Sequence, residues 1–397
     1  MDYKKYLEDV PSGLRDINIF QTAGTKALGK LSIGFGLACQ VGTEAIKFGK
    51  GKVLLVTDQN IMNEGLHKII LESLDNNKLE VEIFSNVEAE PKVDTAQKIQ
   101  ELARINNFFL VVGIGGGSVL DIAKIASIAA NNPEDILEYM HGKPITNEGL
   151  PCILLPTTAG TGSEVSAFVV LSEEDRKLFI SNPLIYPTIA LVDPLLTMTM
   201  PPKVTAYTGL DALSHGIEGM ISKPSPLVEV FSNKCVELVF KNLRRAFEKS
   251  EDFEARYNMS LAAVLGMMAY SQGGGLYAHS FSYILTEKIG LPHGLGCGIT
   301  LPYTLIYNYE YIKPILNGYS NQTGFAGGKE IITNLIVLLQ ELEIPSSFKA
   351  LGVTEEMLPD YARDLIDKYH RARNPRPMNL VEANDFVKRI WNGCYEC

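Results

Sequence analysis

Four residues in the second half of the sequence have side chains and spacings that suit one divalent metal ion. Asp211 and His215 lie four positions apart in the apolar-periodic segment G-L-D-A-L-S-H-G-I-E, so on a helix both side chains leave the same face. His279 and His293 follow, and a glycine and a proline just before His293 let the chain fold back. Three imidazoles and one carboxylate suit Fe(II) or Zn(II) and are too rich in nitrogen for Ca(II) or Mg(II).

Each of these residues also has a plain structural interpretation. An Asp/His pair on one helix face is often a surface pair, His279 could be a satisfied core histidine, and His293 stands in a P-H-G turn. The sequence has six histidines and three belong to this group, which favours a shared ion over chance clustering. The other three have polar neighbours and no partner, and we interpret them as surface residues: His67, His141 and His370.

A glycine-rich segment in the first half has the composition of an anion site. G-I-G-G-G-S-V-L-D-I-A-K, residues 113–124, directly follows the apolar run Phe108–Val112. Consecutive glycines allow a tight turn and leave backbone N–H groups at the start of the next helix, where the helix dipole also favours an anion. The spacing differs from G-x-G-x-x-G, so the standard dinucleotide fingerprint does not apply. A pyrophosphate is the favoured guest, and a tight turn without a ligand is the alternative.

Two further polar segments follow strand candidates. P-T-T-A-G-T-G-S-E, residues 156–164, offers the hydroxyls of Thr157, Thr158 and Thr161 beside two glycines, and ligands bind at such strand ends in open α/β sheets. Asp58 closes the run K-V-L-L-V-T-D. A carboxylate there can accept hydrogen bonds from an adenosine ribose and would repel a 2′-phosphate, so it favours NAD over NADP. A capped helix start for the threonine loop and an Asx turn at Asp58 are the alternatives.

The elements that must position these residues divide the chain into two parts. In the first part, short apolar runs alternate with amphipathic helical segments, which predicts an α/β layer with a mostly parallel sheet. The strand candidates are Lys52–Asp58, Val81–Phe84, Phe108–Gly113, Cys152–Pro156 and Ile189–Asp193. The helix candidates of this part are Ile61–Leu74, Val93–Ile105 and Val119–Ala130.

The sequence changes character after the Met-Pro-Pro at residues 200–202. From Lys203 onward the apolar periods are helical almost throughout. The helix candidates are Leu227–Lys249, Phe253–Gln272, Glu330–Leu342 and Val381–Trp391. The predicted domains are therefore residues 1–201, an α/β domain, and residues 202–397, an all-α domain. We interpret residues 1 to about 16 as a polar lead-in.

Composition excludes several classes of protein. The chain has 397 residues, of which 46% are hydrophobic and 21% charged, which is ordinary for two well-filled domains. A net charge of −10 argues against a nucleic-acid partner. No apolar run reaches about 18 residues, as a membrane span would need, and the N-terminus lacks the apolar stretch of a signal peptide. Six cysteines without framework spacing fit a reducing cytosol, so we expect a cytoplasmic protein.

Taken together, these motifs resemble the iron-dependent (group III) alcohol dehydrogenase family. The resemblance extends from about Phe35 to the C-terminus. Its pieces agree in order and spacing: V-T-D, G-G-G-S-V-L-D-I-A-K, P-T-T-A-G-T-G-S-E, the D-P at Asp193, G-L-D-A-L-S-H-G-I-E and P-H-G-L-G. It implies a dinucleotide-binding N-terminal domain, a helical C-terminal domain, a cleft between them for cofactor and metal, and a homodimer. The implied activity is hydride transfer between NAD and a small primary alcohol or its aldehyde, with or without an anionic group.

The family pattern gives roles to particular residues of this sequence. It implies Asp211, His215, His279 and His293 as the ligands of Fe(II), with Zn(II) as the alternative ion. The cofactor-binding candidates stand in or near the two loops: Asp58, Gly115, Gly116, Gly117, Ser118, Asp121, Thr157, Thr158, Thr161 and Lys177. Two positions depart from the pattern. Tyr283 stands where many members have a second histidine, and Glu90 replaces an asparagine before Pro91.

His279 and Tyr283 are the candidates for a catalytic role, with Tyr283 as a proton relay or a substrate contact. Three other functions stay open. A hydroxyacid-oxoacid transhydrogenase would turn over without free NAD. A lyase of the dehydroquinate-synthase kind would need a glutamate ligand and several basic residues for a phosphate, which do not stand at the corresponding positions. A non-enzymatic anion-binding scaffold is the third.

Overall fold

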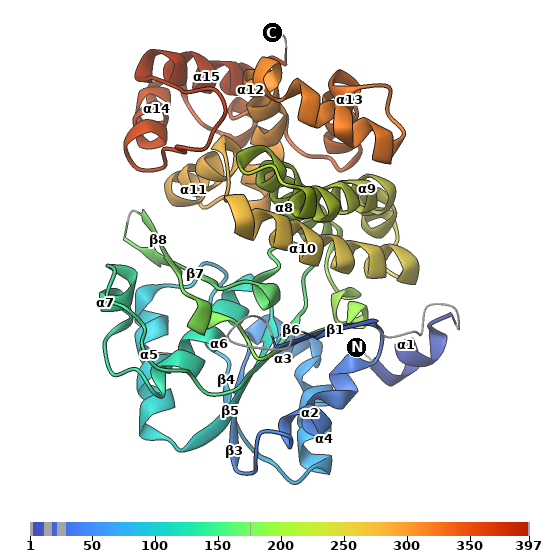
Figure 1. Cartoon of the computed structure of the whole chain (residues 1–397), viewed down its shortest axis with the longest axis vertical. Coiled ribbons are helices and arrows are strands. Elements are labelled where there is room, and N and C mark those ends of the chain that lie inside the picture. The colour runs from blue at the N-terminus through green and yellow to red at the C-terminus, as the bar shows by residue number, and fades with distance from the viewer. Residues whose placement is uncertain (1–2, 12–17, 22–28, 175, 396–397) are drawn as a thin grey trace. The chain divides into compact units, whose positions relative to one another are not determined.

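The computed structural model describes residues 3–11, 18–21, 29–174 and 176–395. The chain forms two compact units, Met1–Met200 with Glu251–Ser260 and Pro201–Ser250 with Leu261–Cys397. The first unit contains the strands and the second is built from helices (Figure 1). The segment Glu251–Ser260 comes from the helical half of the sequence and contributes Phe253 and Tyr257 to the packing around Phe35.

A seven-stranded sheet forms the centre of the first unit. Its strands run in the order β1-β2-β9-β6-β5-β3-β4, and the neighbouring strands are parallel except for β1 with β2. The bounds are β1 Asn18–Gln21, β2 Lys30–Ile33, β3 Lys52–Val56, β4 Glu80–Phe84, β5 Phe108–Gly115, β6 Cys152–Pro156 and β9 Ile189–Val192. The predicted α/β layer with a mostly parallel sheet is confirmed. Strands β1 and β2 were not predicted, because they are four residues each and include polar residues.

Helices pack on this sheet around two separate buried clusters. The bounds are α1 Tyr3–Asp9, α2 Val41–Ala45, α3 Gln59–Glu64, α4 His67–Asn76, α5 Val93–Ile105, α6 Gly117–Ala129 and α7 Ile136–Met140. In β3, Leu54 and Val56 belong to the cluster that contains α5 and α6, whereas Val53 and Leu55 belong to the cluster that contains α2 and α4. Successive side chains of a strand point to opposite faces. A strand that is buried on both faces therefore needs the continuous apolar run that predicted it.

A β-hairpin and several short 3-10 helices complete the first unit. The hairpin pairs β7, Phe168–Glu173, with β8, Arg176–Ser181, in antiparallel fashion. The 3-10 helices are η2 Leu37–Gln40, η3 Ser163–Val165, η4 Pro183–Ile185 and η5 Pro194–Thr197. None of these elements was predicted, because the segments are short and mix polar with apolar residues.

Two expectations about the N-terminal half were wrong. The candidate helix Ile61–Leu74 is divided into α3 and α4, because Gly65 takes a left-handed conformation at the end of α3. The N-terminal residues are more than a polar lead-in. They form α1, in which Tyr3 is buried and its hydroxyl donates a hydrogen bond to Asp193; residues 12–17 lie outside the described part.

The interpretation of His67 as a surface residue was also wrong. His67 is buried in the first turn of α4, and its Nδ1 lies 3.4 Å from the carbonyl oxygen of Ile61. Its polar sequence neighbours gave no sign of this, because the break at Gly65 turns the helix face inward. His141 and His370 are exposed, as expected.

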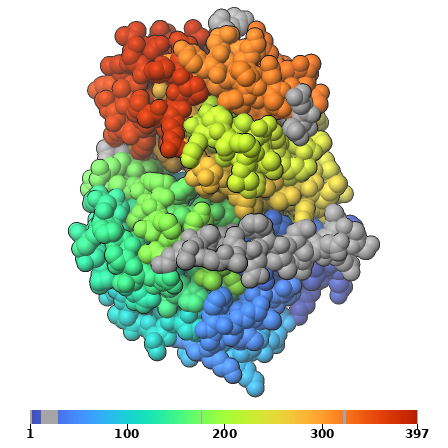
Figure 2. Space-filling model, viewed as in Figure 1, coloured from blue at the N-terminus to red at the C-terminus, as the bar shows by residue number. Residues whose placement is uncertain are grey.

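The second unit consists of helices within its described residues. Their bounds are α8 Pro202–Ser222, α9 Pro226–Glu248, α10 Phe253–Gly273 from Leu261 onward, α11 Tyr277–Ile289, α12 His293–Thr323, α13 Gly328–Glu341, α14 Leu358–Asp367 and α15 Leu380–Asn392, with the short η6 Lys349–Leu351 and η7 Glu355–Met357. The predicted all-α character is confirmed. Figure 2 shows α13, α14 and α15, in orange to red, as one continuous part of this unit's surface. Among the described residues, no helix has the length and apolar character that crossing a membrane requires.

The longest helix, α12, escaped prediction for a physical reason. It contains Pro302 and Pro314 in its interior, and a proline inside a helix removes a hydrogen bond and usually ends or kinks it. A pattern with two such residues therefore does not indicate a single helix of 31 residues.

Candidate metal centre and cofactor loops

Helix α8 presents Asp211 and His215 on a buried face. Each residue from Gly209 to Ile221 is buried, and the side chains of Asp211 and His215 are 4% and 6% exposed. Burying a carboxylate among apolar residues is costly unless a cation or hydrogen bonds compensate it. The position of Asp211 therefore calls for a partner of positive charge.

The turn between α11 and α12 brings His293 to the same place. Gly290 ends α11 in a left-handed conformation, and α12 begins at His293 directly after Pro292. A side chain at Gly294 would collide with α8, since a Cβ there would lie 2.1 Å from the carbonyl oxygen of Tyr207. Gly294 thus permits the close approach of α12 to α8. The prediction that the chain folds back before His293 is confirmed.

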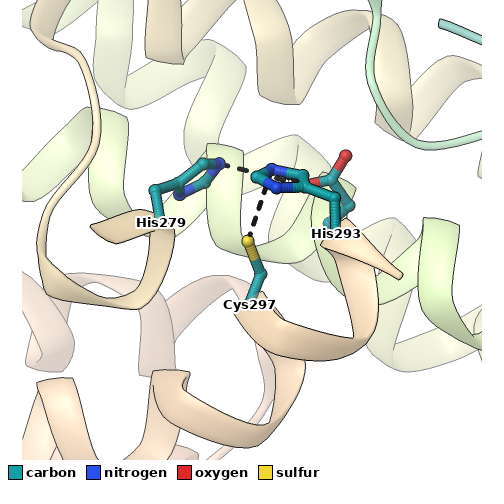
Figure 3. A group of neighbouring side chains, drawn as sticks. His279, His293 and Cys297 are labelled. Carbon is teal, nitrogen blue, oxygen red and sulfur yellow. Dashed lines mark hydrogen bonds and ion pairs between the residues drawn. The ribbon is translucent and has the colours of Figure 1, made fainter. Parts of the chain in front are cut away.

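Three imidazole nitrogens lie close to one buried carboxylate oxygen. Asp211 Oδ1 lies 3.8 Å from His215 Nε2, 3.8 Å from His279 Nε2 and 3.6 Å from His293 Nε2. Donor atoms around a tetrahedral ion at about 2.1 Å would be roughly 3.4 Å apart. The separations therefore fit one shared cation. Figure 3 shows the side chains of His279 and His293 turned toward each other.

Two of these donor atoms lack any other partner. Asp211 Oδ1 and His279 Nε2 are buried and accept no hydrogen bond within the described residues. Buried polar atoms are nearly always satisfied, and each exception needs an explanation. A cation held between them supplies that explanation, so the residues present fit a metal ion.

Hydrogen bonds on the far side of two imidazoles set their tautomers. Glu218, on α8, accepts hydrogen bonds from His279 Nδ1 and from the backbone N–H of Ala278, the latter at 3.0 Å. Ser282 Oγ donates to the carbonyl oxygen of His293 at 2.6 Å and therefore accepts from His293 Nδ1, also at 2.6 Å. With the proton on Nδ1, both Nε2 lone pairs face Asp211, as metal binding requires.

The charges of the cluster suit a cation as well. Burial raises the pKa of Asp211, but the neighbouring His215, His293, His279 and Cys297 together bring it below its usual value. Burial and the neighbouring His215 lower the pKa of His279 well below that of a free imidazole. An ionised carboxylate with a neutral imidazole is the protonation state that binds a metal.

Cys297 is a donor that the sequence analysis missed. Its Sγ lies 3.7 Å from His293 Nε2, and Figure 3 shows the sulfur below the ring of His293. Among the described residues, the donor atoms of Asp211, His279, His293 and Cys297 all lie within 4.8 Å of one another. The predicted ligand His215 is not in this set and approaches it through Asp211. Cys297 follows His293 by four residues on α12. The spacing that singled out Asp211 and His215 would have found it.

In the first unit, the two predicted loops lie side by side. Strands β5 and β6 are parallel neighbours with Gly115 opposite Pro156, and Thr157 N–H donates to the carbonyl oxygen of Gly115 at 2.9 Å. Strand β5 lies between β6 and β3, and Asp58 follows β3. The glycine loop, the threonine loop and Asp58 therefore share the carboxyl edge of the sheet, where ligands of such sheets bind.

The start of α6 has the features of an anion site. Its N-cap, Gly116, has no side chain to accept from the first backbone N–H groups, which leaves them available to a ligand. A Cβ on Gly117 would lie 2.7 Å from Thr161, so the threonine loop packs directly on this turn. Ser118 Oγ donates to the carbonyl oxygen of Ala89.

Asp121 is engaged within the protein. Its carboxylate accepts hydrogen bonds from Ser163 Oγ at 2.6 Å and from Val170 N–H at 3.0 Å. Lys124, fully buried, donates to Asp121, to Ser163 Oγ at 2.7 Å and to the carbonyl oxygen of Phe168. This network ties α6 to the threonine loop, so Asp121 holds the two loops in register.

Asp58 and Lys177 also have protein partners. Asp58 caps α3, and its Oδ1 accepts from the N–H groups of Asn60 and Ile61 at 2.7 and 3.0 Å, which is the Asx-type interpretation. Lys177, on β8, donates to Ser172 Oγ at 2.7 Å and to Glu90. The unusual residue before Pro91 is thus paired with the lysine that the family pattern assigns to the cofactor.

Tyr283 lies against the metal centre. Its ring stacks on His293, with centroids 5.3 Å apart and planes at 26°. Burial raises the pKa of its hydroxyl, an effect that Arg371 opposes. Among the four predicted ligands His293 is the most exposed, at 28% of its side chain, so Tyr283 stands at the accessible side of the centre.

Comparisons with known proteins agree with this geometry. The model of iron-containing alcohol dehydrogenases matches residues 29–194, and the C-terminal model of the same family matches residues 205–391. Long-chain-alcohol dehydrogenase 1 of Geobacillus thermodenitrificans is 31% identical over 376 residues, which are 91% of this chain and 94% of that protein.

Solved structures show the same fold over nearly the whole chain. The crystal structure of a 1,3-propanediol oxidoreductase has a TM-score of 0.86 at 29% identity and covers 90% of this chain and 97% of its own. Sulfoacetaldehyde reductase from Bifidobacterium kashiwanohense, solved in complex with NAD+, has a TM-score of 0.84 at 28% identity, with 94% and 98% covered. The chain belongs to the iron-containing alcohol dehydrogenase family.

Proposed function

We propose that this protein transfers a hydride between NAD and a small primary alcohol or its aldehyde, with one divalent ion held by Asp211, His215, His279 and His293. The observation that carries the proposal is the convergence of three Nε2 atoms on one buried carboxylate oxygen. The family membership supports the oxidoreductase class. When bound, the metal supplies a Lewis acid for the substrate oxygen and NAD supplies the hydride acceptor.

The residues of the second unit prepare the metal site. Glu218 and Ser282 hold two imidazoles with their Nε2 lone pairs inward. We assign the exposed side of His293 to the approach of the substrate. Tyr283 stacks there and is our candidate for a proton relay or a substrate contact. An unchanged turnover and pH profile in Tyr283→Phe would remove it from the reaction.

The residues of the first unit form the proposed NAD site. The backbone N–H groups of Gly117 and Ser118, with Gly115 and Gly116 leading into the turn, would bind the pyrophosphate. Thr157, Thr158 and Thr161 would line the cofactor, and Lys177 would stand at its edge. Asp58 uses Oδ1 for the helix cap, so its other oxygen is the one we assign to the ribose, which favours NAD over NADP. Asp121 would act through Ser163.

Finer points of the proposal concern the ion, the assembly and the domains. Fe(II) is the expected ion, although this nitrogen-rich set also suits Zn(II), and a thiol at Cys297 makes it softer. We also propose a homodimer in the cytoplasm, with residues 1–201 as the NAD-binding domain and residues 202–397 as the metal-binding domain. Light scattering and metal analysis of the purified protein test the first two points.

A screen of aldehydes with NADH tests the function. Protein stripped of metal and reloaded with Fe(II) or Zn(II) is mixed with NADH and short aldehydes, and the loss of NADH absorbance is followed. We expect metal-dependent oxidation of NADH and little with NADPH. Turnover of a hydroxy acid and a 2-oxo acid without free NAD would favour a transhydrogenase. Absence of any turnover in metal-replete protein would contradict the proposal.

A further inference from the structure

One arginine, Arg371, lies beside the metal centre. Arg371 lies in the segment between α14 and α15, and its Nε donates to Ser280 Oγ at 2.9 Å. Its guanidinium carbon lies 5.7 Å from the centre of the Tyr283 ring. Within the described residues, no carboxylate lies within ion-pair distance of this guanidinium. The side chain is partly buried, and a partly buried charge is more favourable with a counter-ion beside it.

The neighbouring arginines are different. Arg373 is exposed and donates to the backbone carbonyl of Gly273 at 2.7 Å. Arg376 lies 4.2 Å from the ring of Tyr307 and forms an ion pair with Glu382 at 3.2 Å. Both are satisfied by the fold away from the metal centre. Of these three, Arg371 is the one that lies against Tyr283, whose ring stacks on His293.

The segment that carries Arg371 is fixed on both sides. Before it, the carbonyl oxygen of Tyr369 accepts a hydrogen bond from Ser280 Oγ at 2.7 Å. After it, the side chains of Asn374 and Asn308 bond reciprocally at 2.8 and 3.0 Å. The guanidinium is therefore held in place before any ligand arrives, which lowers the entropic cost of binding.

Arg371 lies near the accessible side of the metal centre. Tyr283 stacks on His293, the most exposed of the predicted ligands, and Arg371 lies on the ring of Tyr283. The ring of Tyr283 thus contacts both the most exposed of the predicted ligands and a guanidinium that the fold already holds in place.

We propose that Arg371 binds an anionic group of the substrate, so that the preferred substrates are short primary alcohols or aldehydes bearing a carboxylate, sulfonate or phosphonate. The guanidinium offers the flat donor fork that such oxyanions match. The inference rests on the proposed function, because it places the reacting oxygen at the metal. The anion would supply, at ion-pair distance, the negative charge that the described residues do not place beside Arg371.

The test compares a charged and a neutral aldehyde in reduction by NADH. In the wild type, kcat/KM for 4-oxobutanoate should exceed that for butanal. Arg371→Met should lower kcat/KM for 4-oxobutanoate about 10- to 100-fold, mainly through KM, which is the range for a lost charge-assisted bond. Butanal reduction should stay within about twofold. Arg371→Lys should give an intermediate loss for the anion only, and the exposed Arg373→Met should behave as the wild type.

A second measurement needs no variant. Ethanesulfonate should inhibit butanal reduction by the wild type competitively, and the neutral ethanesulfonamide should not. Equal losses for both aldehydes in Arg371→Met, no preference of the wild type for the anion, or absence of inhibition by ethanesulfonate would each overturn the inference. Reduction of neither aldehyde by the metal-loaded wild type would contradict the proposed function itself, whereas reduction of both with equal efficiency would contradict only the role of Arg371.

Discussion

The two candidate sites differ in the groups that form them: side chains in the metal centre and backbone groups in the cofactor loops. The metal centre of the second unit consists of side chains, with Asp211 Oδ1 and His279 Nε2 left unsatisfied by the fold. The cofactor loops of the first unit consist of backbone at the start of α6, and their side chains, such as Asp121 and Lys124, are satisfied by one another. A site made of side chains depends on the identity of each residue. A site made of backbone N–H groups depends on glycines, because a side chain there would block the approach of a ligand or of a neighbouring loop.

The largest effect should follow a change of charge at the metal centre. Asp211→Asn keeps the shape of the side chain and removes the negative charge that faces three imidazoles. We expect metal content after dialysis to fall from about one ion per chain to below about one tenth, and activity to fall at least about 1000-fold. NAD affinity, measured by fluorescence titration, should stay within about twofold, because Asp211 belongs to the other unit. Retention of the full metal content would contradict the assignment.

The first unit should show its own pH dependence through Glu164, which is buried beside Lys124 in the threonine loop. Burial raises the pKa of Glu164 from 4.5 to about 7. The folded state therefore binds this proton more tightly than the unfolded state, and the resulting stability is present below pH 4.5 and is lost as the pH rises through 7. In cofactor-free protein, Glu164→Gln should be more stable than the wild type by about 3 kcal/mol at pH 8.

Urea unfolding of the wild type and Glu164→Gln between pH 4 and 8 measures this difference. The gap in unfolding free energy should close as the pH falls toward 4.5, where both side chains are neutral. A gap that does not change with pH would show that Glu164 is not a buried carboxylate whose ionisation opposes folding.

A smaller effect should follow the addition of one methyl group to the cofactor loops. In Gly117→Ala the new Cβ would lie 2.7 Å from Thr161, so the threonine loop must shift. We expect the Kd for NAD to rise about tenfold, which is about 1.4 kcal/mol, with metal content unchanged. Gly318→Ala is the matched control, because a Cβ there meets nothing within 4 Å. Equal NAD affinity in the wild type and Gly117→Ala would argue against a ligand at this turn.

The contrast between the sites also explains what could be read from the sequence. Residue type and a spacing of about one helical turn identify Asp211 and His215 as candidate ligands. Glycines before a helix indicate a turn that can bind an anion, but not which side chains hold the turn in place. The roles of Ser163 and Lys124 depend on contacts between segments some 40 positions apart, which no local pattern contains.

Other features required the fold. Arg371 stands in a basic stretch with Arg373 and Arg376, and only the packing of α11 against the segment after α14 distinguishes it. Ser282 and Glu218 become tautomer-setting residues because α11 and α12 fold back on α8. Cys297 was within reach of sequence reasoning, since it repeats the four-residue spacing, whereas the burial of His67 depends on the break at Gly65.

The central claim is that Asp211, His215, His279 and His293 hold one divalent ion, and anomalous diffraction tests it most directly. Crystals of the metal-loaded protein are measured on both sides of the iron and zinc absorption edges. We predict a single strong peak at about 2.0–2.3 Å from Asp211 Oδ1 and the three Nε2 atoms. A peak elsewhere, or none in protein that contains a full equivalent of metal, would contradict the account.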